Sequence, residues 1–180
     1  MPLGEDAMFE TRDGEVALAG DPAAQAGDAH LVFIGVIRSP WKRREDCPKN
    51  MREARERGGG ATVEIAPAYR PGLEGLAATS HVAVLSWLHH APRNLIVQKP
   101  RHAVQSKGVF ALRSPVRPNP VGLHVVRLVD VDPTSGVLSL EAIDVLDGTP
   151  VIDIKPYFAS TDAVPDAAYA KGQTSGDGSS

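Results

Sequence analysis

The sequence predicts a mostly β protein: a small, closed β-barrel-like single domain with one or two short helices and no Rossmann sheet. Three observations favour this fold. Short apolar runs interrupted by Pro and Gly recur along the middle of the chain, as in strands joined by turns. Helix-forming composition is confined to short stretches, too few for an α/β fold with a helix after nearly every strand. A length of 180 residues suits one domain.

Eight segments favour strands, and we expect them to close on themselves as one sheet. They are 31–37, 61–66, 80–88, 94–98, 108–112, 121–131, 136–145 and 150–154. The pair 121–131 and 136–145 is the clearest unit, because both segments alternate apolar and polar residues around a turn containing Pro133 and Gly136. This pair should form an antiparallel hairpin.

The expected helices are short. Residues 51–57 (MREARER) have helix-forming composition and are followed by three Gly residues, which predicts a helix that ends there. A second short helix is expected over 71–78.

The chain divides into an arm, a core and a tail. Residues 1–29 lack periodicity and predict a flexible acidic arm, the domain is expected over 30–170, and residues 171–180 predict a flexible tail. Within 29–155 there are 17 Lys or Arg against 12 Asp or Glu, a net charge of +5. This basic core suits a polyanion such as RNA, although an ordinary soluble surface can carry the same charge.

Several classes of protein and site are excluded. No apolar run approaches the roughly 20 residues of a spanning helix, so we expect no membrane association. The single cysteine, Cys47, and the absence of a leader-like apolar centre favour the cytoplasm. No glycine fingerprint for a dinucleotide follows a strand, and the His and Cys spacings match no metal site, so no metal is expected.

Three stretches are rich in unusual chemistry. In 108–122, closely spaced Pro residues stiffen a polar loop, which favours binding, whereas the simpler reading is a connecting loop with solvated Arg side chains. Segment 144–157 places three Asp residues near an Asp-Gly turn, which suits an ammonium or ribose ligand; alternatively these carboxylates cap the turn or pair with Lys155. His89 and His90 follow a strand end, where sites and merely exposed side chains both occur.

Five sequence segments together resemble the TsaA-like (YaeB-like) family. They are IGVIRSPW at 34–41, SH at 80–81, the His pair at 89–90, VFALRSPVRPNPVGL at 109–123 and DVLDGTPVIDIKPY at 144–157. The resemblance implies a homodimeric β-barrel enzyme that uses S-adenosyl-L-methionine to methylate N6 of threonylcarbamoyladenosine next to the tRNA anticodon. It agrees with the missing glycine fingerprint.

The resemblance also implies a cofactor pocket. Its expected residues are Pro48, Lys49, Asn50, His89, His90, Arg113, Asp144, Val145, Leu146, Asp147, Gly148 and Thr149. Arg113 would bind the cofactor carboxylate, and acceptors at 144–148 would bind its ammonium group. His89, His90 and Asp144 are alternative general bases, between which the sequence does not choose.

Substrate contacts are expected beside this pocket. The stiff segment provides Arg117 and Asn119, and Trp41 or Tyr157 would stack on a flipped anticodon-loop base. Two other functions remain open at this point: methylation of a small molecule with the same cofactor, and cofactor binding without catalysis.

Overall fold

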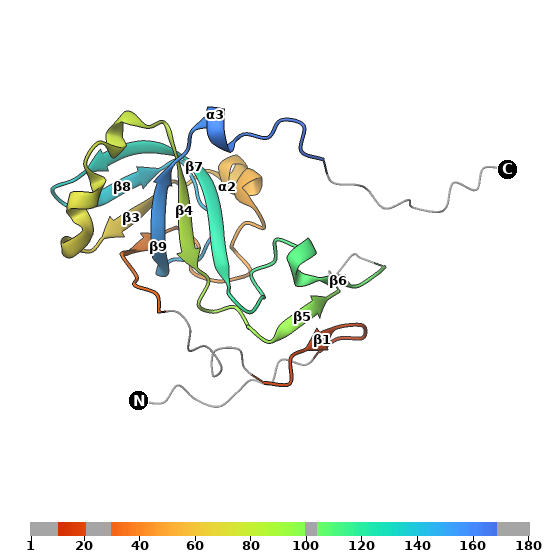
Figure 1. Cartoon of the computed structure of the whole chain (residues 1–180). Helices are drawn as coiled ribbons and strands as arrows, with labels where there is room; N and C mark the ends of the chain where they lie inside the picture. Colours follow the sequence, from red (N-terminus) through yellow and green to blue (C-terminus); the bar gives the residue numbers. More distant parts are fainter. Residues whose placement is uncertain (1–10, 21–29, 100–103, 169–180) are drawn as a thin grey trace, which may run out of the picture.

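Six antiparallel strands form a closed barrel in the computed structural model, which describes residues 11–20, 30–99 and 104–168 (Figure 1). In order around the barrel the strands are β2 (Gly35–Arg38), β3 (Ala61–Ile65), β8 (Val137–Leu140), β7 (Val121–Asp132), β4 (His81–Trp87) and β9 (Thr149–Pro156). Strand β9 pairs back onto β2 and closes the sheet. The predicted mostly β, barrel-like fold is therefore confirmed.

The barrel core follows the two-residue period of its strands. In β4, Val82, Val84 and Ser86 are buried, while the residues between them are only partly covered. Each buried Val contributes roughly 1.5–3 kcal/mol relative to an exposed position. The fully buried apolar side chains of the strands converge on the barrel axis: Ile37, Val63, Val82, Val84, Val126, Leu138 and Val151.

Strands β7 and β8 form the predicted hairpin, but the second strand is shorter than expected. It ends at Leu140, whereas the sequence predicted a strand to residue 145. Ile143 and Val145 are buried in the core cluster without joining the sheet. Their apolar character therefore reflects the burial of a loop. In the sequence, such a loop shows the same apolar pattern as a strand.

Helix α2 (Met51–Arg57) confirms the first helix prediction. The side-chain oxygen of Asn50 accepts a hydrogen bond from the Glu53 amide at 3.0 Å, and the Glu53 carboxylate accepts one from the Lys49 amide at 2.9 Å. These bonds satisfy amides that have no partner inside the helix. Gly58, at φ 68°, ends it. The predicted helix over 71–78 is instead replaced by the 3-10 turns η1 (Pro67–Leu73) and η2 (Leu76–Ala78).

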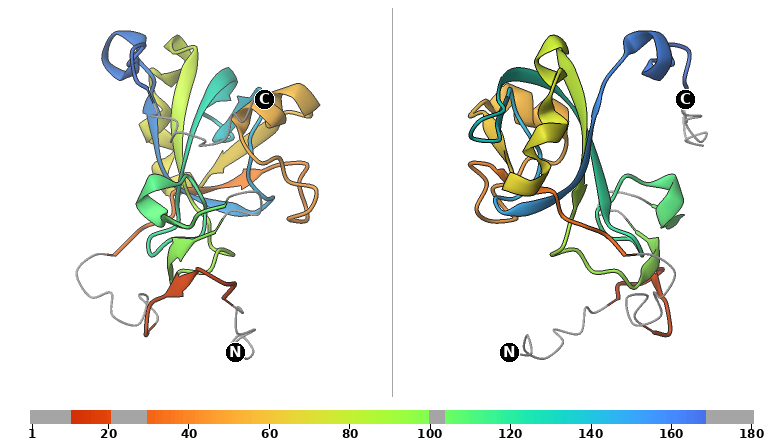
Figure 2. Two further views of the ribbon diagram at one scale, coloured as in Figure 1. Left: turned by 90° about the vertical axis from the view of Figure 1, so that its right-hand side faces the viewer. Right: turned by 60° about the vertical axis from the view of Figure 1, so that its left-hand side comes forward.

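A small sheet lies beside the barrel (Figures 1 and 2). The barrel therefore has fewer strands than the eight that the sequence predicted. The small sheet contains β1 (Val16–Ala17), β5 (Leu95–Gln98) and β6 (Lys107–Gly108). Two segments predicted for the barrel, 94–98 and 108–112, therefore lie outside it, and most of the second forms the turn η3 (Val109–Ala111). Helix α3 (Ala159–Asp162) follows the last strand.

Part of the predicted arm is described, and it contacts the small sheet. The Arg12 guanidinium lies 2.6 Å from the Glu15 carboxylate, and the Lys99 amide donates to the same carboxylate at 3.2 Å. The rest of the predicted arm and the predicted tail lie outside the described residues. Across the described ranges, none of the helices is long and apolar enough to cross a membrane.

Candidate functional site

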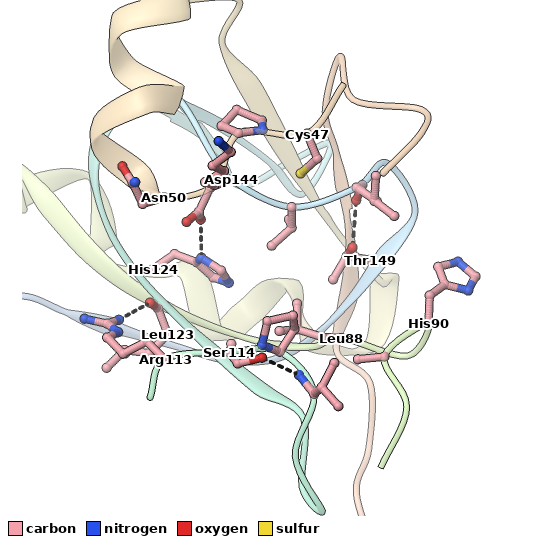
Figure 3. Close-up of a pocket in the computed structure, with 18 of the residues that line it drawn as sticks. Cys47, Asn50, Leu88, His90, Arg113, Ser114, Leu123, His124, Asp144 and Thr149 are labelled. Carbon is pink, nitrogen blue, oxygen red and sulfur yellow. Dashed lines mark hydrogen bonds and ion pairs between the residues drawn. The ribbon is translucent and has the colours of Figure 1, made fainter. Parts of the chain in front are cut away.

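A cavity of about 840 Å³ opens where β4 ends and β9 begins (Figure 3). Its walls come from four segments, 44–52, 88–92, 113–124 and 144–149. The barrel brings these segments together because β4 pairs with both β7 and β9. The volume lies in the range of small-molecule and cofactor sites.

Most of the residues expected to bind the cofactor line this cavity. They are Pro48, Lys49, Asn50, His89, His90, Arg113, Asp144, Val145, Leu146 and Thr149. Arg117, expected to contact substrate, lines it as well. The structure thus gathers residues from distant motifs around one space, and their individual roles stay predictions.

Asp147 and Gly148 do not line the cavity. The Asp147 carboxylate accepts a hydrogen bond from the Ser39 amide at 3.1 Å and lies 2.7 Å from the Lys42 ammonium. The hydrogen bond from Lys42 lowers the pKa of Asp147. The Gly148 amide donates to the Ile37 carbonyl at 2.8 Å. Both residues therefore fasten the site loop to β2 and the segment after it.

Trp41 also lies outside the lining. Its indole N–H donates to the Ile143 carbonyl at 2.8 Å, and the Arg57 guanidinium lies 5.7 Å from its ring centre. The ring thus joins the site loop to the segment before α2, and its stacking on a substrate base stays a prediction.

Tyr157 and Asn119 are likewise not brought to the cavity. The Tyr157 amide donates to the carbonyl of His81, at the opposite end of β4 from the cavity-lining Leu88. Strand β9 starts at the cavity and carries the chain to the far end of the barrel. The Asn119 side-chain oxygen accepts a hydrogen bond from Arg93 at 3.4 Å, which holds a connecting loop.

The two Arg residues of the stiff segment have different surroundings. Arg117 donates to the Val109 carbonyl at 2.8 Å and to the Leu112 carbonyl at 2.5 Å, so its guanidinium clamps the loop. Arg113 is exposed, donates to the Leu123 carbonyl at 3.2 Å, and forms no ion pair with any described residue. The charge of Arg113 is therefore more available to a ligand than the charge of Arg117.

His89 and His90 stand at one wall of the cavity, just after β4. Their ring centres are 3.8 Å apart. Burial, followed by the charge of His90, lowers the pKa of His89. The lowered pKa favours the neutral form of the His89 ring.

The sequence interpretation missed His124, which is only 5% exposed and lies between two polar partners. Its Nδ1 is 2.7 Å from Oδ1 of Asp144, and its Nε2 is 2.9 Å from Oγ of Ser86. The two-residue period of segment 121–131 places His124 on the same face as Val126. A histidine at an inward position of a strand needs buried partners, and this signal could have identified it.

Cys47 also lines the cavity. Burial, together with the nearby charge of Asp144, raises the pKa of its thiol to about 11. The thiol stays protonated at neutral pH and is not an activated nucleophile.

The cavity is basic with a single acid. Among the described residues that line it, Asp144 is the only carboxylate. The cationic lining residues are Arg44, Lys49, Arg52, Arg113 and Arg117. No group of three His, Cys, Asp or Glu side chains in the described part of the chain could hold a metal ion.

Comparisons with known proteins converge on one family. Residues 36–163 match the family described as tRNA-methyltransferase O N-terminal domain. The chain is 42% identical over 145 residues to the "Probable S-adenosyl-L-methionine-binding protein VirR" of Rhizobium radiobacter, covering 81% of this chain and 78% of that protein. It is 37% identical over 148 residues to the tRNA (adenine(37)-N6)-methyltransferase of Escherichia coli K12, covering 78% of this chain and 63% of that enzyme.

A solved structure agrees with these matches. The crystal structure of TrmO from Pseudomonas aeruginosa superimposes with a TM-score of 0.65 and 36% identity, covering 82% of this chain and 64% of that chain. This chain thus spans less than two thirds of the solved protein.

Proposed function

This chain belongs to the tRNA-methyltransferase O N-terminal domain family, and on that premise we propose that it is an S-adenosyl-L-methionine-dependent tRNA methyltransferase. Its acceptor is N6 of threonylcarbamoyladenosine next to the anticodon. The supporting observation is the cavity, which combines residues from both family motifs, a basic lining and a single carboxylate.

The lining suits this cofactor chemically. Leu88, Val116 and Leu146 offer apolar walls to an adenine ring, Arg113 offers a guanidinium to a carboxylate, and Asp144 offers an anion to positive charge. When bound, the cofactor supplies a methyl group on a positively charged sulfur.

The protein's own task is to orient the acceptor nitrogen, exclude water and accept one proton. The acceptor N–H is a poor nucleophile until this proton leaves or is shared. Of the three candidate bases, we propose His89, because it lines the cavity and its lowered pKa keeps its ring able to accept a proton.

The basic lining supports an RNA substrate over a small molecule. Arg44, Lys49 and Arg52 are exposed side chains on the α2 wall of the cavity. Lys and Arg side chains at such a position neutralise phosphates and supply much of the affinity for RNA. A cytoplasmic location fits this substrate.

We also propose a homodimer. Where β4 ends and β7 begins, the outward side chains are apolar, and register places Leu85 opposite Leu123 and Trp87 opposite Val121. Leu123 is 50% exposed and Val121 is 38% exposed. A second copy covering this face would bury it.

Mass spectrometry of nucleosides tests the proposed reaction. Transfer RNA that carries threonylcarbamoyladenosine is incubated with the protein and S-adenosyl-L-methionine, and one methyl group is expected on that nucleoside. Matched tRNA that lacks the threonylcarbamoyl group should stay unmodified. Methylation of the free nucleoside but not the tRNA would favour the small-molecule alternative, and cofactor binding without product would favour a non-catalytic module.

A further inference from the structure

We propose that a buried chain of hydrogen bonds, running from Ser86 through His124 to Asp144, fixes the cavity carboxylate so that it discriminates between the two forms of the cofactor. The carboxylate favours S-adenosyl-L-methionine, with its positively charged sulfur, over the neutral-sulfur product S-adenosyl-L-homocysteine. This inference rests on the proposed function, and it assigns His124 as the positioning residue of Asp144.

This chain of hydrogen bonds connects the barrel interior with the cavity. Ser86 and His124 are buried inward residues of the neighbouring strands β4 and β7. The imidazole lies 2.9 Å from the Ser86 hydroxyl on one side. On the other side it lies 2.7 Å from the Asp144 carboxylate (Figure 3). Both ring nitrogens of His124 are therefore occupied by protein partners, and the ring is not free to act as a base.

The two distances restrict where protons can be. If His124 carried a hydrogen only on Nε2, the bare Nδ1 would face an ionised Asp144 oxygen at 2.7 Å, lone pair against lone pair. Every arrangement compatible with an ionised Asp144 therefore has a hydrogen on Nδ1. Ser86 donates to Nε2 when the ring is neutral and accepts from it when the ring is charged. In both states His124 donates to Asp144.

Gly122 provides the space for this arrangement. It is the register partner of Ser86. A Cβ atom at Gly122 would lie 2.4 Å from Oγ of Ser86 and 2.5 Å from Nε2 of His124, both far inside contact distance. A side chain at this position would displace the Ser86 to His124 bond.

Asp144 presents its second oxygen to the cavity. Its Oδ1 is held by His124, and Oδ2 has no hydrogen-bond or ion-pair partner among the described residues. The Asp144 side chain is 18% exposed and lines the cavity. The charge reaches other lining groups, since it adds to the burial that raises the pKa of Cys47.

A fixed, unpaired carboxylate favours a cation over an equally shaped neutral group. The two cofactor forms differ by a methyl group and one positive charge at sulfur. At an effective dielectric constant near that of partly buried sites, an anion within several ångströms of this charge changes the affinity ratio of the two ligands by about tenfold or more. A carboxylate free to rotate toward one of the lining Arg residues would lose part of this effect.

Isothermal calorimetry with S-adenosyl-L-methionine and S-adenosyl-L-homocysteine tests the inference on four chains: the parent, Asp144→Asn, His124→Asn and His124→Leu. The measured quantity is the ratio of the two affinities. Asp144→Asn should lower the preference for S-adenosyl-L-methionine about tenfold. His124→Asn keeps an N–H near the position of Nδ1 and should retain the parent ratio within about threefold, whereas His124→Leu should lose most of the preference.

Gly122→Ala should also lower the preference for S-adenosyl-L-methionine over S-adenosyl-L-homocysteine. Gly72→Ala is its matched control and should keep the parent preference, because a Cβ at Gly72 meets nothing within 4 Å. If a His124 variant unfolds, Gly122→Ala and Ser86→Ala still test the chain of hydrogen bonds, because each disturbs the bond between Ser86 and His124. Long-range ¹H–¹⁵N spectra of the parent supply a second readout and should show the His124 hydrogen on Nδ1.

The outcomes separate the two proposals. A parent chain that binds neither ligand overturns the proposed function. A parent that binds both, with Asp144→Asn weakening both equally, overturns the charge discrimination. Parent-like ratios in both His124→Leu and Gly122→Ala, or a His124 hydrogen found only on Nε2, overturn the role of the buried chain.

Discussion

At the scale of single residues, the adjacent imidazoles of His89 and His90 should give the site a pH dependence. If neutral His89 accepts the proton, methylation needs its unprotonated form. Because its pKa lies below the ordinary 6.5, this form persists into mildly acidic solution, and the rate should fall only as pH drops below 6.5. His90→Gln removes a charge that lowers the pKa of His89, so the fall should begin at higher pH. A pH profile of kcat on modified tRNA measures both effects.

His89→Gln provides the complementary measurement. It should lower kcat about a hundredfold while cofactor affinity changes little, as expected for loss of a general base. A profile of His90→Gln that coincides with the parent, together with an active His89→Gln, would assign the proton to another group.

Arg113 and Arg117 form a matched pair of variants. Arg113→Ala removes an available charge, so it should weaken S-adenosyl-L-methionine binding about tenfold to a hundredfold without lowering Tm. Arg117→Ala removes donors to the Val109 and Leu112 carbonyls, so it should lower Tm. Calorimetry and thermal unfolding separate these effects, and an Arg113→Ala chain with parent affinity would show that the carboxylate of the cofactor binds elsewhere.

How far single residues could be predicted depends on the kind of signal. Arg113 and Asp144 belong to family motifs, and both reach the cavity. His124 stands in an apolar strand with no polar neighbour in sequence, and its partners Ser86 and Asp144 come from distant segments. The pairing of β4 with β7 brings Ser86 to His124, and the loop after β8 brings Asp144 to it, so these contacts could not be predicted from local sequence.

At the scale of elements, the docking of residues 11–20 on the small sheet depends on Glu15. The side-chain hydrogen bond from Arg12 is the main cause that lowers the pKa of Glu15 from 4.5 to about 2. A lowered pKa means that the charged contact stabilises the docked segment fully above pH 4.5 and is lost as pH falls toward 2. The segment should therefore remain docked through ordinary acidic conditions.

An NMR titration tests this docking. The Lys99 amide donates to Glu15, so its signal should titrate near pH 2. Glu15→Gln should abolish this titration and speed protease cleavage within 11–20. A Lys99 signal in the parent that does not titrate with Glu15 would mean that the segment is undocked in solution.

The errors in the element predictions share one cause. The sequence shows where apolar residues recur, but it does not show whether they are buried by sheet pairing or by loop packing. Segment 136–145 reads as one strand, yet its last residues pack into the core as a loop. That loop carries Asp144 to the cavity, so the missed strand end is also the feature that builds the site.

At the scale of the whole molecule, barrel closure decides which motif residues meet. The closed β fold follows from many short strands and little helix, and it could be predicted. Which end of the barrel a residue occupies could not, because that depends on register and strand direction. Thr149 and Tyr157 belong to one motif, but β9 separates them by the length of a strand. The motif therefore contributes its first half to the cavity and its last half to the opposite end.

The outward apolar face of β4 and β7 leads to the last prediction, which concerns assembly. Light scattering at micromolar concentration should give twice the chain mass of 19.1 kDa. Leu123→Asp should give the mass of one chain, because it places a charge at the centre of this face. Val164→Asp is the matched control, since Val164 is 63% exposed and lies beyond α3, away from the face.

Circular dichroism and Tm must show that both variants fold, so that loss of the dimer reports the interface alone. A parent that scatters as a single chain removes the dimer from the proposal. A dimeric Leu123→Asp would instead place the interface on another surface. Because Leu123 also lines the cavity, a dimer through this face would bring a second copy to the edge of each site. Assembly and cofactor binding should then be coupled, and saturating S-adenosyl-L-methionine should raise the dimer fraction of a partly dissociated parent.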